Sequence, residues 1–309
     1  MGEVLIGTGG WAYFRGPWRA NLEAYSRAFN CVEVNSTFYS TPDMGLVRSW
    51  RAKVPREFRF SVRCHRDLTH RYGLQPTESS FDVYYRMVEI CDALGAEVLH
   101  LLTPARQELS DHVLRGVLEF LDTVEPSEVR LAWEVRGDRK EAEWRQLETI
   151  MQDHDIAHCV DLSVTSPRVR TDILYTRLFG GGVHNLYQFD DRELQKINDK
   201  AEESEQKTYL VFHGGRMYED AARLKAYKET GEFPRASGPT GGGALLKALS
   251  EDAVFPSSKN GLIKDQGWKV IDLTTTERTH ASDLLERLPD RIYFGLNDVR
   301  RALEASQID

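Results

Sequence analysis

Short apolar segments alternate with longer amphipathic ones along most of the chain, and this alternation constrains the fold more than any other feature. Eight short segments have the apolar, β-branched and aromatic content of strands: 4–10, 31–37, 58–65, 96–103, 129–137, 157–163, 172–182 and 207–215. The longer segments between most of them carry apolar residues at helical spacing. Eight such units in roughly 230 residues predict an α/β fold of the TIM-like (β/α)8 barrel type. An open, doubly wound sheet is the main alternative.

The composition of the chain changes near Phe233. The stretch "FPRASGPTGGG", residues 233–243, is rich in Pro, Gly and Ser and is typical of a linker. Its GPTGGG part can cradle a phosphate, but no predicted strand precedes it, so we favour the linker. Residues 244–309 contain helical stretches without a clear βα unit. We therefore predict a barrel domain over 1–232, a linker over 233–243 and a small helical domain over 244–309.

The bulk composition limits the compartment and the class of partner. With 41% hydrophobic and 28% charged residues, the 309-residue chain has the composition of a globular protein. No window approaches the ~20 apolar residues of a membrane span, and the N-terminus lacks the features of a secretory signal. We therefore expect a cytoplasmic protein without a membrane partner. A net charge of −8 does not favour broad binding of nucleic acid.

The cysteines do not suggest a cluster. They are widely scattered and form no C-x-x-C pair; the four are Cys31, Cys64, Cys91 and Cys159. This spacing argues against a clustered zinc or iron–sulfur site and against a disulfide scaffold. Cys64 lies beside His65, but adjacent strand residues point to opposite sides, so we predict a packed thiol rather than a nucleophile.

Ionisable side chains recur at the carboxyl ends of the predicted strands. Because alternate residues of a strand face opposite sides, each strand divides into an apolar set facing the helices and a second set facing the barrel interior. The second set contains Glu33, Asn35, Thr37, Arg63, His65, Glu134, Arg136, Asp161 and His213. Arg177 is in phase with Tyr175, although both sides of its strand contain apolar residues.

Two interpretations of these charges are open. An isolated buried ion costs several kcal/mol unless it is paired, so the groups can form a salt-bridged plug inside the barrel. The sites of (β/α)8 enzymes lie at the carboxyl ends of the strands, however, and a plug does not require so many groups at one end. We therefore favour a ligand site. The basic segment "RCHRDLTHR", residues 63–71, is either part of that site or a solvated face.

The residue types suggest an anionic ligand. Guanidinium groups bind phosphate and carboxylate bidentately, which suits Arg63, Arg136 and Arg177. Glu33 and Glu134 are candidates for a general acid/base pair. Aromatic residues in the loops after the first two strands can stack on a ring or can simply pack; they are Trp11, Tyr13, Phe38 and Tyr39.

A divalent metal is a further possibility. Donor atoms are present on Glu33, His65, Glu134, Asp161 and His213. No local ligand motif such as H-E-x-x-H links them, and the nearby arginines would compete with a cation, so we assign no metal ligand. The chain also lacks a P-loop, a G-x-S-x-G elbow and a G-x-G-x-x-G turn.

Several sequence blocks resemble the domain-of-unknown-function 72 (YecE-like) family. They are "IGTGGWAY", "FNCVEVNSTFYSTP", "VPREFRFSVRCHRDLTH", "WEVRG" and "YTRLFGG", and the resemblance covers roughly residues 4–230. It implies a TIM-like barrel structurally related to the xylose isomerase and endonuclease IV group, and it carries over no settled activity. The matched residues are Trp11, Tyr13, Glu33, Asn35, Thr37, Phe38, Tyr39, Arg63, Thr69, His70, Glu134, Arg136, Asp161 and Arg177.

The chain departs from the family pattern at four places. The family often has Lys at the position of Arg63, His at that of Gly137 and of Phe179, and paired Asn at the end of the eighth strand, where this chain has His213 and Gly214. The roles of those histidines therefore cannot be transferred. The segment "LPDRIYFGLNDVRRAL" is similar to the 2795 family of unknown function.

Our leading hypothesis is an enzyme acting on a small anionic substrate, phosphorylated or nucleotide-like, by acid/base catalysis. The catalytic candidates are Glu33, Glu134, His65 and Asp161. The binding candidates are Trp11, Tyr13, Asn35, Thr37, Tyr39, Arg63, His70, Arg136, Arg177 and His213. Hydrolysis and isomerisation are both open. The alternatives are metal-dependent phosphodiester chemistry on nucleic acid, by analogy with endonuclease IV, and a binding or assembly protein whose residues 244–309 dock a protein partner.

Overall fold

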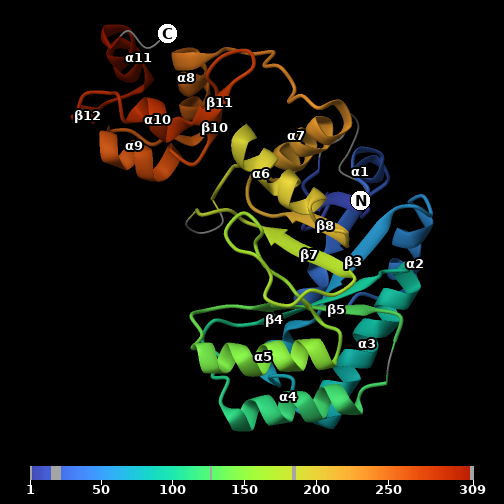
Figure 1. Cartoon of the computed structure of the whole chain (residues 1–309). Helices are drawn as coiled ribbons and strands as arrows, with labels where there is room; N and C mark the ends of the chain where they lie inside the picture. Colours follow the sequence, from blue (N-terminus) through green and yellow to red (C-terminus); the bar gives the residue numbers. More distant parts are fainter. Residues whose placement is uncertain (1, 15–21, 126, 183–185, 307–309) are drawn as a thin grey trace. The chain divides into compact units, whose positions relative to one another are not determined.

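The computed structural model describes residues 2–14, 22–125, 127–182 and 186–306 (Figure 1). The described residues form two compact units. The first takes in residues up to Leu178 together with Lys200–Phe212, and the second takes in Phe179–Asp199 and the residues from His213 onward. Each unit is considered by itself below.

The first unit is built on eight parallel strands. They are β1 (Val4–Thr8), β2 (Cys31–Val34), β3 (Arg59–Arg63), β4 (Val98–Thr103), β5 (Arg130–Val135), β6 (Ala157–His158), β7 (Ile173–Leu178) and β8 (Lys207–Phe212). They are ordered β6-β5-β4-β3-β2-β1-β8-β7, and a parallel bridge between Val160 and Thr176 joins the two ends. The sheet therefore closes on itself, which confirms the predicted TIM-like barrel and excludes the open doubly wound sheet.

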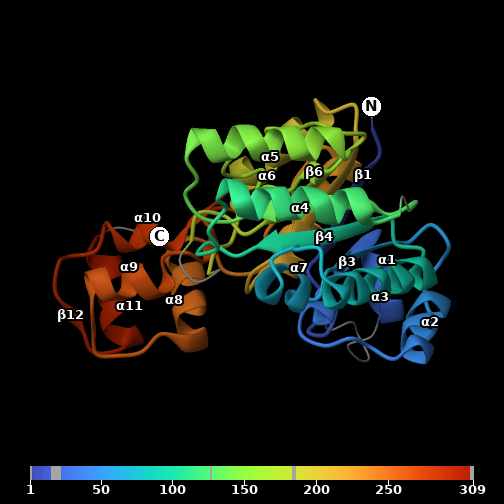
Figure 2. The same ribbon diagram turned by 90° about the horizontal axis from the view of Figure 1, so that it is seen from below.

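The predicted helices lie between the strands in chain order. They are α1 (Leu22–Ala28), α2 (Met44–Ala52), α3 (Glu78–Leu94), α4 (Asp111–Thr123) and α5 (Glu141–Asp153), and α6 (Asp191–Glu202) and α7 (Met217–Thr230) follow β7 and β8. In both ribbon views α3, α4 and α5 lie on the outside of the strands (Figures 1 and 2). Local signals set their ends. The Asp43 carboxylate accepts a hydrogen bond from the Gly45 amide at 2.7 Å to cap α2, and α3 ends at Gly95 with φ of 61°.

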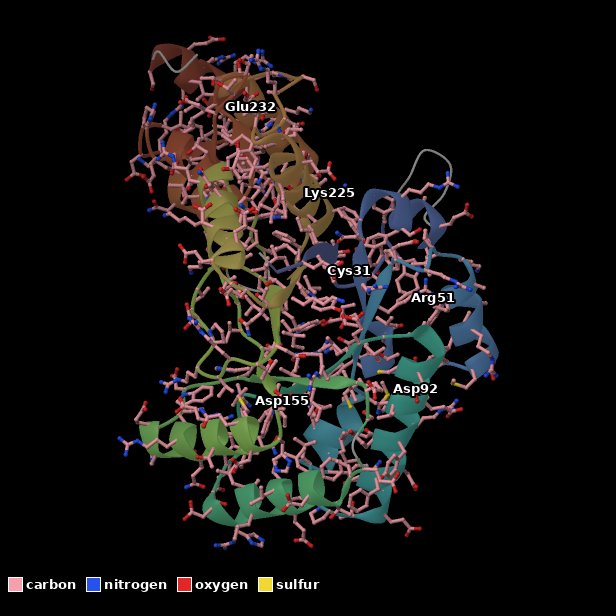
Figure 3. All side chains as sticks on the ribbon, turned by 45° about the vertical axis from the view of Figure 1, so that its right-hand side comes forward. Cys31, Arg51, Asp92, Asp155, Lys225 and Glu232 are labelled. Atoms are coloured by element: carbon pink, nitrogen blue, oxygen red, sulfur yellow. The ribbon has the colours of Figure 1, made fainter. Side chains whose placement is uncertain are left out.

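Side chains fill the space that the strands enclose (Figure 3). One buried layer takes residues from most of the strands: Leu5, Cys31, Val98, Ala132, Ala157, Cys159, Ile173, Tyr175, Tyr209 and Val211. At the amino ends of the strands, Glu97 pairs with Arg59 at 3.0 Å and with Lys207 at 2.5 Å. The interior is therefore a packed core closed by ion pairs at the end that serves stability in such barrels.

The carboxyl-terminal part of the second unit has its own apolar core. Four helices build it: α8 (Gly241–Asp252), α9 (Lys259–Gln266), α10 (Ala281–Leu285) and α11 (Leu296–Ala305). Their core includes Leu245, Leu249, Leu262, Leu284, Tyr293 and Val299. This region is helical as predicted, and α8 takes in the last three residues of the segment predicted as a linker.

Short strands accompany these helices and were not predicted. β9 (Ser257–Ser258) pairs antiparallel with β12 (Ile292–Tyr293), and β10 (Val270–Asp272) pairs antiparallel with β11 (Arg278–His280). The predicted domain boundaries and the similarity to the 2795 family stay predictions. Across the described residues, no helix is both long enough and apolar enough to cross a membrane.

Candidate functional site

A buried ion-pair network crosses the barrel interior at the centre of the candidate site. Arg177 on β7 is 2% exposed, and its Nε lies 3.0 Å from Oε2 of Glu33 on β2, which is fully buried. Its Nη1 donates to Oε2 of Glu134 on β5 at 2.6 Å. The structure thus brings together three predicted site residues from three strands. Burial lowers the pKa of Arg177, but Glu33 and Glu134 outweigh it and raise that pKa, so the guanidinium stays charged.

Hydroxyl groups fix the position of Glu33. The Tyr175 hydroxyl donates to Glu33 Oε2 at 3.0 Å, and the Ser61 hydroxyl lies 2.8 Å from that of Tyr175. Both donor residues belong to the inward-facing phase of their strands, β7 and β3. Glu33 is therefore held by a guanidinium on one side and a hydroxyl chain on the other.

Glu134 connects the buried network to Arg136, which is partly exposed to solvent. Its Oε1 accepts a hydrogen bond from Nε of Arg136 at 2.6 Å, and the Arg136 side chain is 43% exposed. Burial raises the pKa of Glu134, but Arg177, His100 and Arg136 outweigh it and hold that pKa well below its usual range. At neutral pH Glu134 is therefore a carboxylate.

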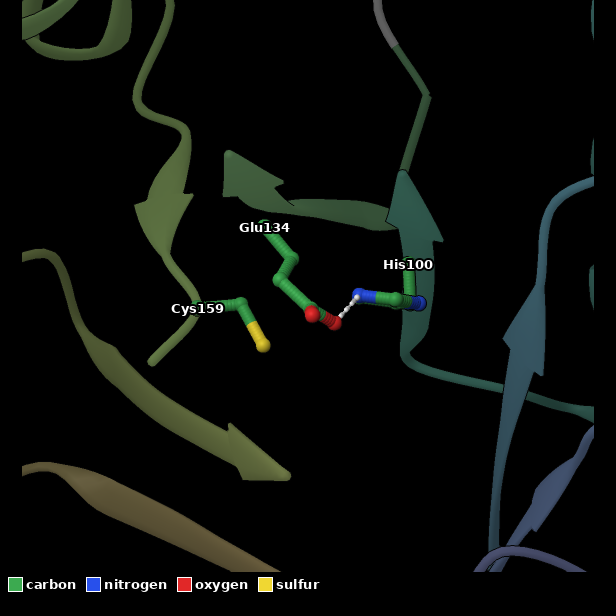
Figure 4. Close-up of side chains that lie close together, drawn as sticks. All are labelled: His100, Glu134 and Cys159. Atoms are coloured by element: carbon green, nitrogen blue, oxygen red, sulfur yellow. Dashed lines mark ion pairs between the residues drawn. The ribbon is translucent and has the colours of Figure 1, made fainter. Parts of the chain in front are cut away.

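His100 on β4 completes the network and was missed from the sequence. Its Nε2 lies 3.2 Å from Glu134 Oε2 (Figure 4). The side chain is fully buried, and burial, followed by the charge of Arg177, lowers its pKa. The imidazole is therefore neutral near pH 7. Neither ring nitrogen makes a hydrogen bond of good geometry with the described residues, and Nδ1 lies 3.9 Å from Glu33 Oε2.

Arg63, at the end of β3, differs from Arg177 in its partners. Its Nη1 donates to the Asn35 amide oxygen at 2.8 Å, and its guanidinium carbon lies 3.6 Å from the centroid of the Phe38 ring. Arg63 is 7% exposed, and its Nε is buried without a hydrogen-bond partner in the described part of the chain. No carboxylate of the described residues lies within ion-pair distance of this guanidinium. Burial, followed by the charge of Arg177, lowers its pKa.

The residues after β2 and β3 hold Arg63 in place. Thr37, in a 3-10 turn over Ser36–Phe38, places its Oγ1 2.6 Å from both the Val34 and the Arg63 carbonyl oxygens. The hydroxyl therefore ties the end of β2 to the end of β3.

His70 packs edge-on against the Phe38 ring. Its ring centroid is 5.1 Å from that of Phe38, and its Nδ1 is 2.9 Å from the Thr69 hydroxyl. Burial and the charges of Arg63, Arg136 and Arg66 lower the pKa of His70. The imidazole is exposed and is neutral at pH 7.

The remaining predicted residues make contacts of their own. Tyr13 and Tyr39 are exposed, and Trp11 packs edge-on against Trp50 with ring centroids 5.3 Å apart. His65 accepts a hydrogen bond from the Asp67 amide at 3.2 Å, and Asp161 accepts one from the Ser163 amide at 3.0 Å. His213, in the second unit, stacks on Phe179 with ring centroids 4.6 Å apart. The catalytic roles predicted for His65 and Asp161 stay predictions.

One group of residues in the barrel has metal-ligand spacing. The donor atoms of His100, Glu134 and Cys159 all lie within 4.8 Å of one another (Figure 4). Both carboxylate oxygens of Glu134 already face guanidinium groups, those of Arg177 and Arg136. Burial, followed by the charge of Glu134, raises the pKa of the Cys159 thiol well above its usual range. These residues fit a bound cation poorly, because it would need a thiolate and would face two fixed positive charges.

A second such group, in the second unit, has a structural explanation. It consists of Asp190, Glu193 and His280. Glu193 Oε2 accepts from the Asp190 amide and Asp190 Oδ1 accepts from the Glu193 amide, both at 2.8 Å. This reciprocal pair is a capping box at the start of α6.

The residues that sequence reasoning missed are His100, Tyr175, Ser61 and Cys159. His100 had a usable signal, because it is the polar residue in the middle of the apolar run "VLHLLT". His100 is two residues after Val98, which lies in the interior layer, so strand alternation predicts that His100 also faces the barrel interior.

Comparison with known proteins agrees with this architecture. The sequence profile of the family described as "Protein of unknown function DUF72" matches residues 5–239. The UPF0759 protein YecE of Escherichia coli K12 is 30% identical over 131 residues, which are 42% of this chain and 46% of YecE. The chain thus spans about half the length of the curated relatives it matches.

Two solved structures share the fold. A DUF72 family protein of Enterococcus faecalis V583 is 14% identical, with a TM-score of 0.58 over 74% of this chain and 98% of that one. A DUF72 family protein of Thermotoga maritima MSB8 is 21% identical, with a TM-score of 0.56 over 74% of this chain and 99% of that one. At these identities the likeness concerns the fold alone. The profile match covers more than half of the chain, and on that basis the protein belongs to the DUF72 family.

Proposed function

We propose that the barrel is an enzyme that acts on a small anionic substrate, phosphorylated or nucleotide-like, by acid/base catalysis at the carboxyl ends of its strands. The observation that carries this proposal is the state of Arg63. Its guanidinium is buried against Phe38, and its side-chain hydrogen bond goes to the neutral amide of Asn35. A buried cation without a paired anion is costly, and a bound oxyanion would relieve that cost.

The charge balance of the cluster supports the same conclusion. Three guanidiniums, of Arg63, Arg136 and Arg177, face two carboxylates, of Glu33 and Glu134. Arg177 contacts both carboxylates and Arg136 contacts one of them. The neutral His100 does not change the balance. The surplus positive charge therefore lies with Arg63, which suits a phosphate or carboxylate.

His70 is the best-placed proton acceptor in this cluster. Its lowered pKa keeps the imidazole neutral at pH 7, and it packs on the Phe38 ring that supports Arg63. In the tautomer whose Nδ1–H donates to the Thr69 hydroxyl oxygen, Nε2 is the nitrogen that accepts a proton. Glu33 and Glu134 are weaker bases, because each is in contact with the Arg177 guanidinium. Their proposed role is to hold Arg177 and shape the field around the substrate.

Both reactions weighed above remain compatible with this arrangement. A neutral imidazole beside a bound anion can take a proton from water in a hydrolysis or from carbon in an isomerisation. Metal-dependent phosphodiester chemistry has less support, because Arg136 and Arg177 occupy the oxygens of Glu134.

A substrate screen with two variants tests the proposal. Sugar phosphates and nucleotides are incubated with the full chain, and conversion is followed by mass spectrometry and ³¹P NMR. We expect H70N to bind the converted compound as the unchanged protein does and to lose at least about 100-fold in turnover. H70Q, which has a longer side chain and likewise no basic nitrogen, should lose the same activity. Retained turnover in H70N would reject His70 as the base, and binding without turnover of any anion would favour a binding protein.

A further inference from the structure

A cavity of about 510 Å³ lies beside His70 in the first unit. It is lined by residues that follow β3, residues that follow β4, and the start of α4. Loops at this end of a parallel barrel carry the substrate contacts in enzymes of this fold. The volume is that of a site for a small molecule. His70 is among the lining residues and Arg63 is not, so the cavity adjoins the site already described.

The lining of this cavity is basic. It includes Arg71, Arg106 and His112 in addition to His70, and the acidic residue among the lining residues is Glu108. Neither Arg71 nor Arg106 has an ion-pair partner among the described residues. In a chain with a net charge of −8, two unpaired arginines facing one cavity indicate an anion site rather than general surface polarity.

An unsatisfied acceptor also lines the cavity. The side-chain oxygen of Gln107 is buried and has no hydrogen-bond partner in the described part of the chain. The backbone of Gln107 is fixed, because Arg139 Nη1 donates to its carbonyl at 2.7 Å. A buried acceptor without a donor is uncommon in folded proteins.

The loop that presents Arg71 has an unusual and well-anchored backbone. Asp67–Arg71 form one turn of π-helix, closed by the Tyr72 amide donating to the Asp67 carbonyl at 2.8 Å. Leu74, a buried residue, then adopts φ of 58°, and its amide donates to the Leu68 carbonyl at 2.9 Å. Single π-turns and left-handed leucines carry strain that the surrounding structure must hold. The turn places His70 and Arg71 at the cavity.

His70 connects the cavity with Arg63. The imidazole lines the cavity and packs edge-on against Phe38, and Arg63 stacks on the same phenyl ring. The Arg63 guanidinium and the imidazole therefore contact the same aromatic ring.

We propose that this cavity is a second anion subsite, and that the substrate is a small molecule with two separate anionic groups on either side of His70. Arg63 binds one group, and Arg71 and Arg106 bind the other. This inference rests on the proposed function and narrows its substrate class. It also assigns a role to the basic segment 63–71, for which a solvated face was the alternative.

Calorimetric titration of the full chain with inorganic phosphate tests the subsites. We expect two phosphate sites per chain in low-salt buffer. The double variant R71Q/R106Q should keep one site, R63Q should keep the other, and R48Q, which removes an exposed arginine of α2, should keep both. Because Arg71 and Arg106 are exposed, the double variant is expected to fold, which circular dichroism checks. If the titration shows a single phosphate site that R63Q removes and R71Q/R106Q leaves unaffected, this inference is overturned and the proposed function stands.

A sugar that carries two phosphate groups tests the substrate class. A hexose bisphosphate should bind one to one and at least about tenfold more tightly than the hexose monophosphate, and R71Q/R106Q should remove that preference. Equal affinity for the two sugars would overturn the inference that the substrate carries two anionic groups. Phosphate binding that R63Q leaves unchanged would instead overturn the proposed function.

Discussion

Arg177 links two carboxylates that would otherwise repel each other inside the barrel. Replacing it in R177M leaves Glu33 and Glu134 buried without their common cation. Removing one partner of a buried ion pair costs about 3–5 kcal/mol, so we expect the free energy of unfolding in urea to fall by that amount. Adding E33Q to R177M should recover part of the loss. An unfolding free energy equal to that of the unchanged protein would contradict the network.

Glu134 gives the protein a defined response to acid. Its folded pKa lies well below its usual range: burial raises it, but Arg177, His100 and Arg136 outweigh that. The resulting stability is complete above the unfolded pKa of about 4.3 and is lost as the pH falls toward the folded value. We expect E134Q to be less stable than the unchanged protein at pH 7 and to lose less stability between pH 7 and acid. Urea unfolding at several pH values measures this, and parallel pH curves for the two proteins would refute it.

At this scale the sequence predicted which residues face inward but not their partners. The alternation of β2 and β5 was enough to put Glu33 and Glu134 in the inward-facing phase. That Arg177 contacts both carboxylates could not be predicted. The contacts with Glu33 and Glu134 join residues 144 and 43 positions apart, and they depend on closure of the sheet. His100 was overlooked because a single polar residue in an apolar strand is weak evidence of a buried charge network.

Among the elements, the junction of β2 and β3 is held by one side chain. Thr37 bonds the last carbonyl of each strand, so T37V removes the tie with little change in shape. We expect the free energy of unfolding in urea to fall by about 1–3 kcal/mol, since the two buried carbonyls lose the one hydroxyl proton that they share. Phosphate affinity should also fall, because the Arg63 backbone is released. T37S, which keeps the hydroxyl, is the matched control, and equal behaviour of T37V and T37S would argue against this tie.

The ends of several strands could not be predicted from the periodicity of apolar residues. The second strand was predicted to reach residue 37, but it ends at Val34, because Asn35 takes a helical backbone conformation that starts the 3-10 turn. The sixth was predicted over 157–163 and is regular only over Ala157–His158. There the Asp161 side chain bonds the Ser163 amide and turns the chain. β9 to β12 have two or three residues each, too few for a periodic pattern, and exist through their pairing.

At the scale of the whole molecule, strand number and order were predictable because the βα repeat is regular. Eight apolar segments in chain order became eight parallel strands, and the family profile covers the same region, residues 5–239. The apolar core near the carboxyl terminus was predicted only as a set of helices. Which helices pack together depends on contacts between residues such as Leu245 and Val299, which no local pattern specifies.

That core provides a test in the second unit. Leu284 is fully buried in it, so L284A should cost about 2–5 kcal/mol through the cavity it leaves. Hydrogen exchange followed by mass spectrometry should show faster exchange across residues 244–306. L296A, at a partly buried residue that packs against this core, is the milder control. Unchanged exchange in L284A would mean that these helices do not share one core.

The central claim is that Arg63 is the buried cation that binds the substrate's anionic group, and the thermal shift produced by inorganic phosphate tests it most directly. The unchanged protein should be stabilised by phosphate, more at low than at high ionic strength. R63Q should lose the part of that shift that binding at Arg63 contributes, R63K should keep some of that part because the charge remains without the bidentate geometry, and R48Q should keep the whole shift. A phosphate-induced shift of the same size in R63Q and in the unchanged protein would contradict the account.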